Sequence, residues 1–358
     1  MPGNKFMEKA LEIAERGRLF VSPNPMVGTV IVKNGKIIAS GWHRSFGGEH
    51  AEVAALRKAG RNAKGAVMYV SLEPCCHYGK QPPCTKKIIE SGIRKVVVAA
   101  RDPNPVVDGR GIKELRKAGI EVGVLHMKEA VSLNRKYFRF RESGRPFVLL
   151  KLAMTSDGKI TWGNGRRKLI SGKESMVLAH RLRSEYDAVL VGINTILKDN
   201  PGLTCRLVEG RNPVRVVVDS EARVPLDANV LKGYAGTIIA CTKKAHAGKV
   251  RKLQDIGIGV LVVKQKRGQV DLSNLVSQLG MAGFTGILVE GGAQVAASFI
   301  EQGVADAFVF AVSEKISGTG ADAFSSRHVK RLFPGKVYRL GNDVIVEGFI
   351  GRKRPRIK

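Results

Sequence analysis

Cysteine is scarce in this sequence, and long apolar runs are missing from it. Only five of the 358 residues are cysteine, too few for the disulfide-dense scaffold of small secreted domains. No stretch holds the roughly eighteen consecutive apolar residues that a transmembrane helix needs, so no membrane partner is expected. Residues 1–20 mix charged and apolar residues at helical spacing, unlike the unbroken apolar core of a signal peptide. We therefore expect a cytoplasmic protein.

Acidic residues are also scarce, because 31 Asp and Glu face 60 Lys and Arg and leave a net charge of +29. Such a charge raises the question of a nucleic-acid partner. The excess is spread evenly: residues 1–145 hold 27 basic and 13 acidic residues, and residues 146–358 hold 33 and 18. Attraction of a phosphorylated small molecule explains the charge equally well. We expect such a substrate, no nucleic acid, and a homo-oligomer.

Two stretches that alternate β-rich and helical patterns flank residues 141–146 (RESGRP), which have the charge, Gly and Pro of a linker. The sequence therefore predicts two α/β domains, 1–144 and 145–358. In the first domain we expect a hairpin over 29–41 with its turn at Asn34-Gly35, strands at 67–72, 95–100 and 120–125, and helices near 5–17, from residue 50, after residue 83 and near 111–118. In the second we expect strands at 148–154, 188–192, 214–220, 237–242, 259–263, 286–292 and 307–312, and helices near 173–185 and 293–302.

Three of the five cysteines lie within EPCCHYGKQPPC (73–84), and HAEVAAL (50–56) precedes this loop. A zinc deaminase needs one imidazole and two thiolates as ligands, an open position for water, and a carboxylate that moves protons without binding the metal. His50, Cys75 and Cys84 supply the ligands, and Glu52 supplies the carboxylate. His50 and Glu52 are expected in the first turn of a helix. Cys84 is expected at a helix start, where partial positive charge stabilises a thiolate.

A closed structural zinc site is the alternative interpretation, with Cys76 or His77 as the fourth ligand. Adjacent cysteines seldom reach one tetrahedral ion without strain, and Glu52 would then have no task. The pattern favours the catalytic site.

The second domain carries weaker signals. VEGGAQVAASF places a Gly pair between a strand and a helix, where backbone N–H groups can hold a phosphate, but the G-x-G-x-x-G fingerprint is absent. Lys151 and Glu290 each end an apolar strand run, where side chains of α/β domains face a crevice. The two could also form only a structural ion pair.

The first half, from HAEVAAL through YVSLEPCCHYGKQPPC to VVVAARDPNPVVDGRG, resembles the deaminase half of the bifunctional riboflavin-biosynthesis deaminase/reductases. Most deaminases place two residues between their cysteines, whereas eight separate Cys75 from Cys84 here. KLAMTSDGKI, HRLRSEYDAVLVGINTILKDNPGLTCR, VRVVVDS and ILVEGGAQVAASFI are similar to the family's reductase half. The resemblance implies a cytidine-deaminase-like zinc domain followed by a dihydrofolate-reductase-like domain that uses NADPH.

Matching positions also imply site residues. Cys76 stands where the family commonly has serine and would not be a ligand, and Leu169 stands where many members carry a tryptophan. Lys151 and Glu290 would serve proton donation and orientation during hydride transfer. The implied cofactor positions are Ala153, Leu169, Thr195, Asp199, Ser220, Gly292, Ala293, Gln294, Val295, Ala296, Ala297 and Ser298. The implied substrate positions are Asn24, His43, His77, Lys80, Asp102, Asn104, Arg167, Arg183, Leu203, Arg206 and Glu290.

The activity that follows from the resemblance has two steps in riboflavin biosynthesis. The first is hydrolytic deamination of 2,5-diamino-6-ribosylamino-4(3H)-pyrimidinone 5′-phosphate. The second is NADPH-dependent reduction of the deaminated ribosyl compound to the ribityl product, with Arg183 and Arg206 as phosphate clamps or, alternatively, as ordinary surface arginines. An RNA-associated zinc protein and a polynucleotide deaminase are the other hypotheses, and the cysteine spacing and the second domain argue against both.

Overall fold

The computed structural model describes residues 4–163 and 169–351. The chain divides into two compact units, Met1–Gly144 and Arg145–Lys358. No helix in the described ranges combines the length and the hydropathy that a membrane crossing requires.

The first unit contains a five-stranded mixed sheet. Its strands, in spatial order, are β2 (Lys36–Trp42), β1 (Gly28–Lys33), β3 (Val67–Val70), β4 (Lys95–Val98) and β5 (Glu121–Val124). The helices are α1 (Asn4–Ala14), α2 (Ala51–Ala59), α3 (Cys84–Glu90), α4 (Arg110–Lys117), α5 (Lys128–Leu133) and α6 (Arg135–Ser143), with short 3₁₀ turns at Glu15–Gly17 and Gly60–Ala63. Strands β1 and β2 form the predicted hairpin, and Asn34 and Gly35 take the positive φ values (51° and 71°) that its tight turn requires.

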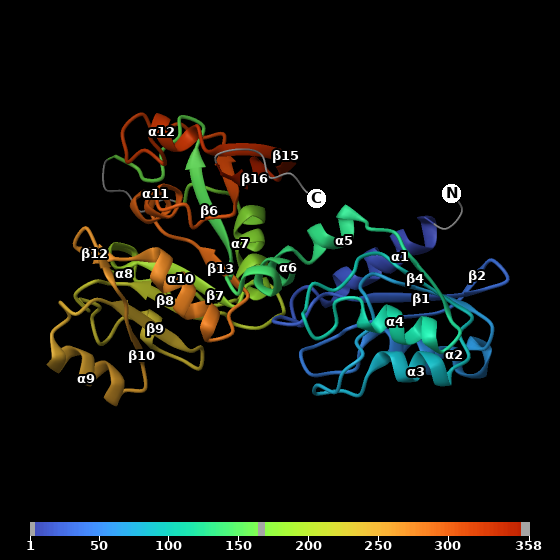
Figure 1. The fold of residues 1–358 in the computed structure, drawn as a ribbon. Coiled ribbons are helices and arrows are strands. Elements are labelled where there is room, and N and C mark those ends of the chain that lie inside the picture. The colour runs from blue at the N-terminus through green and yellow to red at the C-terminus, as the bar shows by residue number, and fades with distance from the viewer. Residues whose placement is uncertain (1–3, 164–168, 352–358) are drawn as a thin grey trace. The chain divides into compact units, whose positions relative to one another are not determined.

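Helices cover both faces of this sheet. One apolar core joins the sheet to α2, α3 and α4, and a second joins it to α1, α5 and α6, as the blue to green part of Figure 1 shows for all but α6. Strand β1 lies between the two cores, so Ile31 faces one and Val30 and Val32 face the other. At Gly41 a Cβ would collide with the carbonyl oxygen of Ala51. Glycine there lets α2 lie close against β2 and fixes the position of the helix that carries Glu52.

Two helices of the first unit were not predicted. The structure places α5 and α6 in residues 128–143 and ends α6 at Ser143, followed by Gly144 with a left-handed φ of 66°. The expected linker at 141–146 was therefore partly wrong, because its first three residues are helical. Aromatic residues on α6 explain the difference, since Tyr137 and Phe138 are buried against the sheet.

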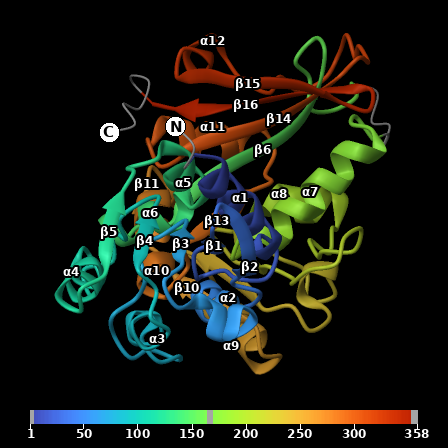
Figure 2. The ribbon, with the colours of Figure 1, turned by 90° about the vertical axis from the view of Figure 1, so that its right-hand side faces the viewer.

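The second unit is built on a nine-stranded sheet. In spatial order its strands are β10 (Gly259–Val262), β9 (Thr237–Cys241), β8 (Val214–Val218), β7 (Ala188–Gly192), β13 (Gly286–Val289), β6 (Phe147–Thr155), β14 (Ala307–Ser313), β16 (Asp343–Ile350) and β15 (Leu332–Leu340). The first seven are parallel, and β16 and β15 add an antiparallel hairpin, which Figure 2 shows beside β14. The helices are α7 (Lys173–Glu185), α8 (Ile193–Asp199), α9 (Ala247–Asp255), α10 (Leu272–Met281), α11 (Ala293–Glu301) and α12 (Ser326–Val329), with a 3₁₀ turn at Asn229–Leu231 and a small hairpin of β11 (Gln265–Lys266) and β12 (Gln269–Val270).

This sheet also has a core on each face. Helices α7, α8 and α9 pack on one side, and α10 and α11 pack on the other. All seven predicted strands of this unit are present, and both predicted helices form. Helices α8, α9, α10 and α12 and the β15–β16 hairpin were not predicted. Strand β15 is largely exposed, so its sequence lacks the apolar run by which the buried parallel strands were found.

Candidate active sites

Three possible ligand atoms meet between the starts of α2 and α3. His50 is the N-cap residue of α2, one position before the helix rather than in its first turn as expected, and Cys84 opens α3. His50 Nδ1 lies 3.2 Å from Cys84 Sγ and 3.5 Å from Cys75 Sγ, and the three ligand atoms all lie within 4.8 Å of one another. No other such group of His, Cys, Asp and Glu occurs among the described residues, so neither Cys76 nor His77 joins it.

The chemistry of this donor set fits zinc. The hydrogen bond with Cys84 lowers the pKa of Cys75, and the same bond, with burial, raises the pKa of Cys84. The Cys84 N–H also donates to Cys75 Sγ at 3.4 Å. Zinc prefers such sulfur and imidazole donors, and three protein ligands leave one coordination position open.

Glu52 lies next to the ligands without being one of them. It is the second residue of α2, its side chain is 4% exposed, and its carboxyl contacts the Cys84 thiol. Burial raises the pKa of Glu52 to about 7. A carboxyl group in this position can reach a water or an amine at the open side of the metal site.

A cavity of about 220 Å³ opens beside His50, Cys75 and Glu52. It brings together all the substrate residues predicted for this unit: Asn24, His43, His77, Lys80, Asp102 and Asn104. The His43 ring is oriented at both nitrogens, with Asn24 Nδ2 at 3.0 Å from Nε2 and the Glu49 carbonyl oxygen at 3.0 Å from Nδ1. Since a carbonyl only accepts, Nδ1 donates and Nε2 accepts. Burial lowers the pKa of His43, so the ring is a neutral part of the wall.

Tyr137 and Arg141 line the same cavity, although the sequence pattern assigned them no role. The Tyr137 hydroxyl lies 2.9 and 3.1 Å from the two Asp102 carboxylate oxygens, and the Asn104 N–H donates to Asp102 Oδ1 at 2.8 Å. Burial raises the pKa of Asp102 to about 6. The Arg141 guanidinium lies over the Tyr137 ring at 5.2 Å. Helix α6 thus orients a carboxyl 35 residues away in the chain, a relation that no local motif signals.

Glu73 is a further buried residue whose role no sequence motif indicates. It is 3% exposed, and its carboxylate accepts the N–H groups of Asp102, Gly109 and Ile112 at 3.2, 3.0 and 3.2 Å. One side chain therefore fastens the loop that carries Cys75 to the loop that carries Asp102.

Glu73→Gln is expected to destabilise the first unit by about 1–3 kcal/mol, the cost of a buried polar group without a partner. In the variant, the side-chain amide nitrogen would face a backbone N–H group that donates to the Glu73 carboxylate in the native protein. Two donors would then meet without an acceptor. Chemical denaturation measures the loss. Glu90→Gln is the matched control, because Glu90 pairs with Lys87 at the surface and such pairs contribute about 0–1 kcal/mol. Equal losses from both variants would contradict the buried role.

The second unit has a cavity of about 370 Å³ at the carboxyl ends of β7, β8 and β13. It gathers six of the predicted cofactor positions: Thr195, Ser220, Gly292, Gln294, Val295 and Ser298. Gly292 is the N-cap residue of α11, and no heavy atom lies within 4 Å of the place where its Cβ would be. At Gly291 a Cβ would lie 2.8 Å from Val295 Cβ. The start of α11 thus offers an open cradle next to unpaired N–H groups, which fits the pyrophosphate of NADPH.

The remaining cofactor predictions do not line this cavity and stay predictions. Ala153 lies in β6 and packs on a core, and Ala296 is 1% exposed. Ala293 and Ala297 lie on α11, and Asp199 is the exposed last residue of α8. Leu169 is 63% exposed, and its carbonyl oxygen accepts from Lys315 Nζ at 3.0 Å.

Glu290 pairs with Arg183 and not with Lys151. Arg183 Nε donates to both Glu290 oxygens at 3.0 and 3.2 Å, Nη2 donates to Oε2 at 2.6 Å, and Nη1 donates to the Thr204 carbonyl oxygen at 3.2 Å. The ion pair considered for Lys151 and Glu290 was therefore wrong. The Lys151 ammonium has no hydrogen bond or ion pair within residues 4–163 and 169–351, and burial lowers its pKa.

The other predicted substrate residues of this unit differ in whether their side chains are exposed. The Arg206 side chain is exposed, and the backbone N–H of Arg206 donates to His180 Nδ1 at 2.9 Å. Leu203 is 3% exposed and has a φ of 52°, so its side chain belongs to the core and only its backbone can face a ligand. Arg167 lies outside the described residues.

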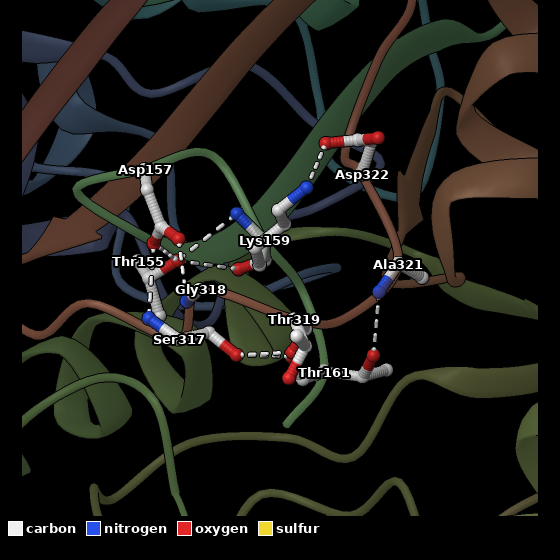
Figure 3. A network of polar contacts seen from close by, with 9 residues as sticks. All are labelled: Thr155, Asp157, Lys159, Thr161, Ser317, Gly318, Thr319, Ala321 and Asp322. Carbon is white, nitrogen blue, oxygen red and sulfur yellow. Dashed lines mark hydrogen bonds and ion pairs between the residues drawn. The ribbon is translucent and has the colours of Figure 1, made fainter. Parts of the chain in front are cut away.

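Asp157 ties together the loops that follow β6 and β14 (Figure 3). Its carboxylate accepts the Thr155 hydroxyl at 2.5 Å and the N–H groups of Ser317 and Gly318 at 3.1 and 2.8 Å. The hydrogen bond from Thr155, followed by those from the backbone, lowers the pKa of Asp157 to about 2. This network steadies the carboxyl end of β6, the strand that carries Lys151.

The comparisons with known proteins agree for both units. The family described as the RibD C-terminal domain matches residues 146–346, and the cytidine and deoxycytidylate deaminase zinc-binding region matches residues 2–100. The riboflavin biosynthesis protein RibD of Aquifex aeolicus is 42% identical over 348 residues, or 95% of this chain and 96% of that protein. The chain belongs to the RibD family.

Solved structures of RibD proteins have the same two-unit fold. Acinetobacter baumannii RibD is similar with a TM-score of 0.87 at 32% identity, covering 98% of this chain and 99% of that one. A Thermotoga maritima diaminohydroxyphosphoribosylaminopyrimidine deaminase/5-amino-6-(5-phosphoribosylamino)uracil reductase is similar with a TM-score of 0.85 at 38% identity, covering 97% and 98%. The predicted fold class, a deaminase-like zinc domain followed by a reductase domain, is confirmed.

As a RibD-family member the chain is a bifunctional enzyme of riboflavin biosynthesis, with a deaminase and a reductase domain. Zn²⁺ and NADPH are the cofactors of the two domains. The hypotheses of an RNA-associated zinc protein and of a polynucleotide deaminase are not favoured, since neither accounts for the reductase domain.

Proposed function

We propose that the chain deaminates 2,5-diamino-6-ribosylamino-4(3H)-pyrimidinone 5′-phosphate and then reduces the resulting 5-amino-6-(5-phosphoribosylamino)uracil to the ribitylamino compound. The observation that carries the proposal is the cluster of His50, Cys75 and Cys84 with buried Glu52 beside them, at a cavity in one unit of a chain whose other unit is a reductase domain. The Thermotoga maritima relative is named for the same two activities.

In the deaminase step, His50, Cys75 and Cys84 hold zinc. When bound, zinc lowers the pKa of a coordinated water and supplies the nucleophile. Glu52 takes a proton from the water side and passes it to the amine that leaves as ammonia. Asp102, held by Tyr137 and Asn104, accepts N–H groups of the pyrimidine and orients it.

In the reduction step, the backbone N–H groups at the start of α11 bind the pyrophosphate of NADPH, which supplies the hydride when bound. Lys151 is the proton donor, because its ammonium is half-buried and not tied up in an ion pair. Arg183 and Glu290 orient each other beside the reacting sugar. Arg206, which is exposed, reaches the substrate phosphate.

The test is incubation of the zinc-loaded protein with the diaminopyrimidinone phosphate, with and without NADPH, followed by mass analysis. The proposal predicts that the substrate exchanges one amino group for an oxygen when NADPH is absent. It also predicts that the product gains two hydrogens only when NADPH is present. An unchanged substrate under both conditions would refute it.

We further propose that the enzyme works in the cytoplasm as a homo-oligomer and has no nucleic-acid partner. The even spread of the net charge supports the last point. Light scattering measures the mass in solution and so tests the homo-oligomer. Salt-dependent retention on RNA would contradict the absence of a nucleic-acid partner, since phosphate contacts make binding depend steeply on salt concentration.

Arg183→Ala is expected to lower reductase kcat/KM by roughly tenfold to a hundredfold and to leave deamination and zinc content unchanged. Removal of Arg183 leaves the Glu290 carboxylate without its partner in a site where the two side chains are 14% and 9% exposed. Loss of one member of such a pair costs about 3–5 kcal/mol, so the second unit should also melt at a lower temperature. Separate assays of the two steps and a thermal melt measure both effects.

Arg206→Ala is the control for this variant, because Arg206 is exposed and makes no contact with Glu290 among the described residues. It should weaken substrate binding without a change in melting temperature. A parallel fall of deamination and reduction in Arg183→Ala would contradict two independent units.

A further inference from the structure

The cavity beside the metal ligands changes in charge from its buried end to its solvent side. At the buried end, Glu52 and His43 are 4% and 3% exposed. Two basic side chains, Lys80 and Arg141, also line the cavity, and both are exposed to solvent. No other lysine or arginine of the described chain lines it. The fixed positive charge of the cavity therefore lies on its solvent side.

The substrate proposed for this unit has a matching distribution of charge. Its pyrimidine carries the amine that leaves, so this ring has to reach the buried end, and the ribose 5′-phosphate extends away from it. A phosphate monoester carries close to two negative charges at pH 7. The buried carboxyl groups of Glu52 and Asp102 would disfavour such an anion at the metal end. The phosphate is therefore expected beside the exposed cations.

The two cations differ in how they can hold a phosphate. Lys80 Nζ lies 3.8 Å from the centroid of the Phe46 ring, which lines the same cavity. An ammonium attracts a phosphate as a point charge, whereas a guanidinium can donate to two of its oxygens at once. Arg141 is therefore the residue better suited to fix the position of the phosphate.

Arg141 is held in place through Tyr137. The two residues are one helical turn apart on α6, so their side chains lie on the same face of the helix. The Arg141 guanidinium lies over the Tyr137 ring at 5.2 Å, and the Tyr137 hydroxyl contacts both Asp102 oxygens at 2.9 and 3.1 Å. Arg141 makes no ion pair with a carboxylate within residues 4–163 and 169–351. Contact with a ring face occupies no hydrogen-bond acceptor, so the guanidinium can still donate to an anion.

We propose that Arg141 binds the 5′-phosphate of the deaminase substrate and makes the deaminase selective for the phosphorylated compound over the same compound without phosphate. The proposal rests on the deamination proposed above. Asp102 orients the pyrimidine, and Tyr137 joins Asp102 to Arg141. The tyrosine ring thus sets the spacing between the group that holds the pyrimidine and the group that holds the phosphate.

The test is steady-state deamination by the full-length, zinc-loaded protein of the diaminopyrimidinone phosphate and of the same compound without its phosphate. Arg141→Gln is expected to lower kcat/KM for the phosphorylated compound by roughly tenfold to a hundredfold, mainly through KM. For the compound without phosphate, kcat/KM should change less than about twofold. Arg16→Gln is the matched control. The Arg16 guanidinium is exposed and lies 5.2 Å from the Trp42 ring, so this variant removes the same kind of contact without removing a residue that lines the cavity.

Equal losses for the two compounds in Arg141→Gln would overturn the proposal, because Arg141 would then act only by supporting Asp102, which faces the pyrimidine that both compounds share. Unchanged kinetics in Arg141→Gln, or an equal effect of Arg16→Gln, would overturn it as well. Arg141→Lys guards against misfolding, because it keeps the charge but loses the fork, and it should give an intermediate kcat/KM for the phosphorylated compound.

Tyr137→Phe separates the two ends of the cavity. It keeps the ring beneath Arg141 but removes the hydroxyl that contacts Asp102, so it should weaken both compounds by a similar factor. A loss confined to the phosphorylated compound in Tyr137→Phe would contradict this division of roles. Failure of the unsubstituted protein to deaminate the phosphorylated compound would refute the deaminase function itself.

Discussion

Glu52→Gln is expected to lower the deaminase rate by about 10²–10⁴-fold, the usual contribution of a positioned acid or base, and to leave zinc bound. The amide has nearly the same shape as the carboxyl group but cannot take up and release a proton. Glu52 is the residue to remove because it is 4% exposed, contacts the Cys84 thiol and lies outside the ligand group. Product formation from the diaminopyrimidinone phosphate and metal analysis of the purified variant measure the two effects.

The reductase step provides the internal control for this substitution. It is assayed on the already deaminated intermediate and should keep its normal rate, since Glu52 belongs to the other unit. Near-normal deamination by Glu52→Gln would contradict the assignment of the proton-transfer group. Loss of zinc in this variant would instead make Glu52 a ligand or a support of the ligands.

Cys84→Ala and Cys75→Ala are each expected to lose zinc and with it nearly all deamination. Each substitution leaves two protein ligands where a catalytic site uses three. Zinc content of the purified protein, measured together with deaminase turnover, tests the expectation. Zinc binding also stabilises the folded state by mass action, so the first unit should unfold at a lower temperature in both variants.

Cys76→Ser is the matched control for the ligand substitutions, because Cys76 is adjacent to a ligand but lies outside the ligand group. Its Sγ is 3.7 Å from the Val106 carbonyl oxygen, a contact that a serine hydroxyl can replace. Zinc content and deamination should stay normal. Zinc loss in Cys76→Ser would bring back the closed structural site.

The reductase half gives a weaker signal in sequence than the deaminase half, and the structure explains the difference. The metal ligands and Glu52 of the deaminase come from two short segments, 50–52 and 75–84, whose residue types are rare and chemically specific. The reductase cavity is lined mainly by glycine, small polar and aliphatic residues from the ends of three strands. Such residues are common in any α/β domain, so only their meeting in space distinguishes them.

Local sequence patterns were enough to predict the two-unit α/β fold, the β1–β2 hairpin, the buried parallel strands and the residues that meet at the zinc site. These features depend on local periodicity, turn chemistry and the rarity of cysteine, all of which are readable within about a dozen residues. No local pattern predicts that Arg183 pairs with Glu290, that Tyr137 holds Asp102, or that α6 extends into the expected linker, because these features depend on how the chain packs. Those contacts join positions 107 and 35 residues apart. An ion pair or a buried hydroxyl has many possible partners in a sequence, and packing of the sheet and helices selects one of them.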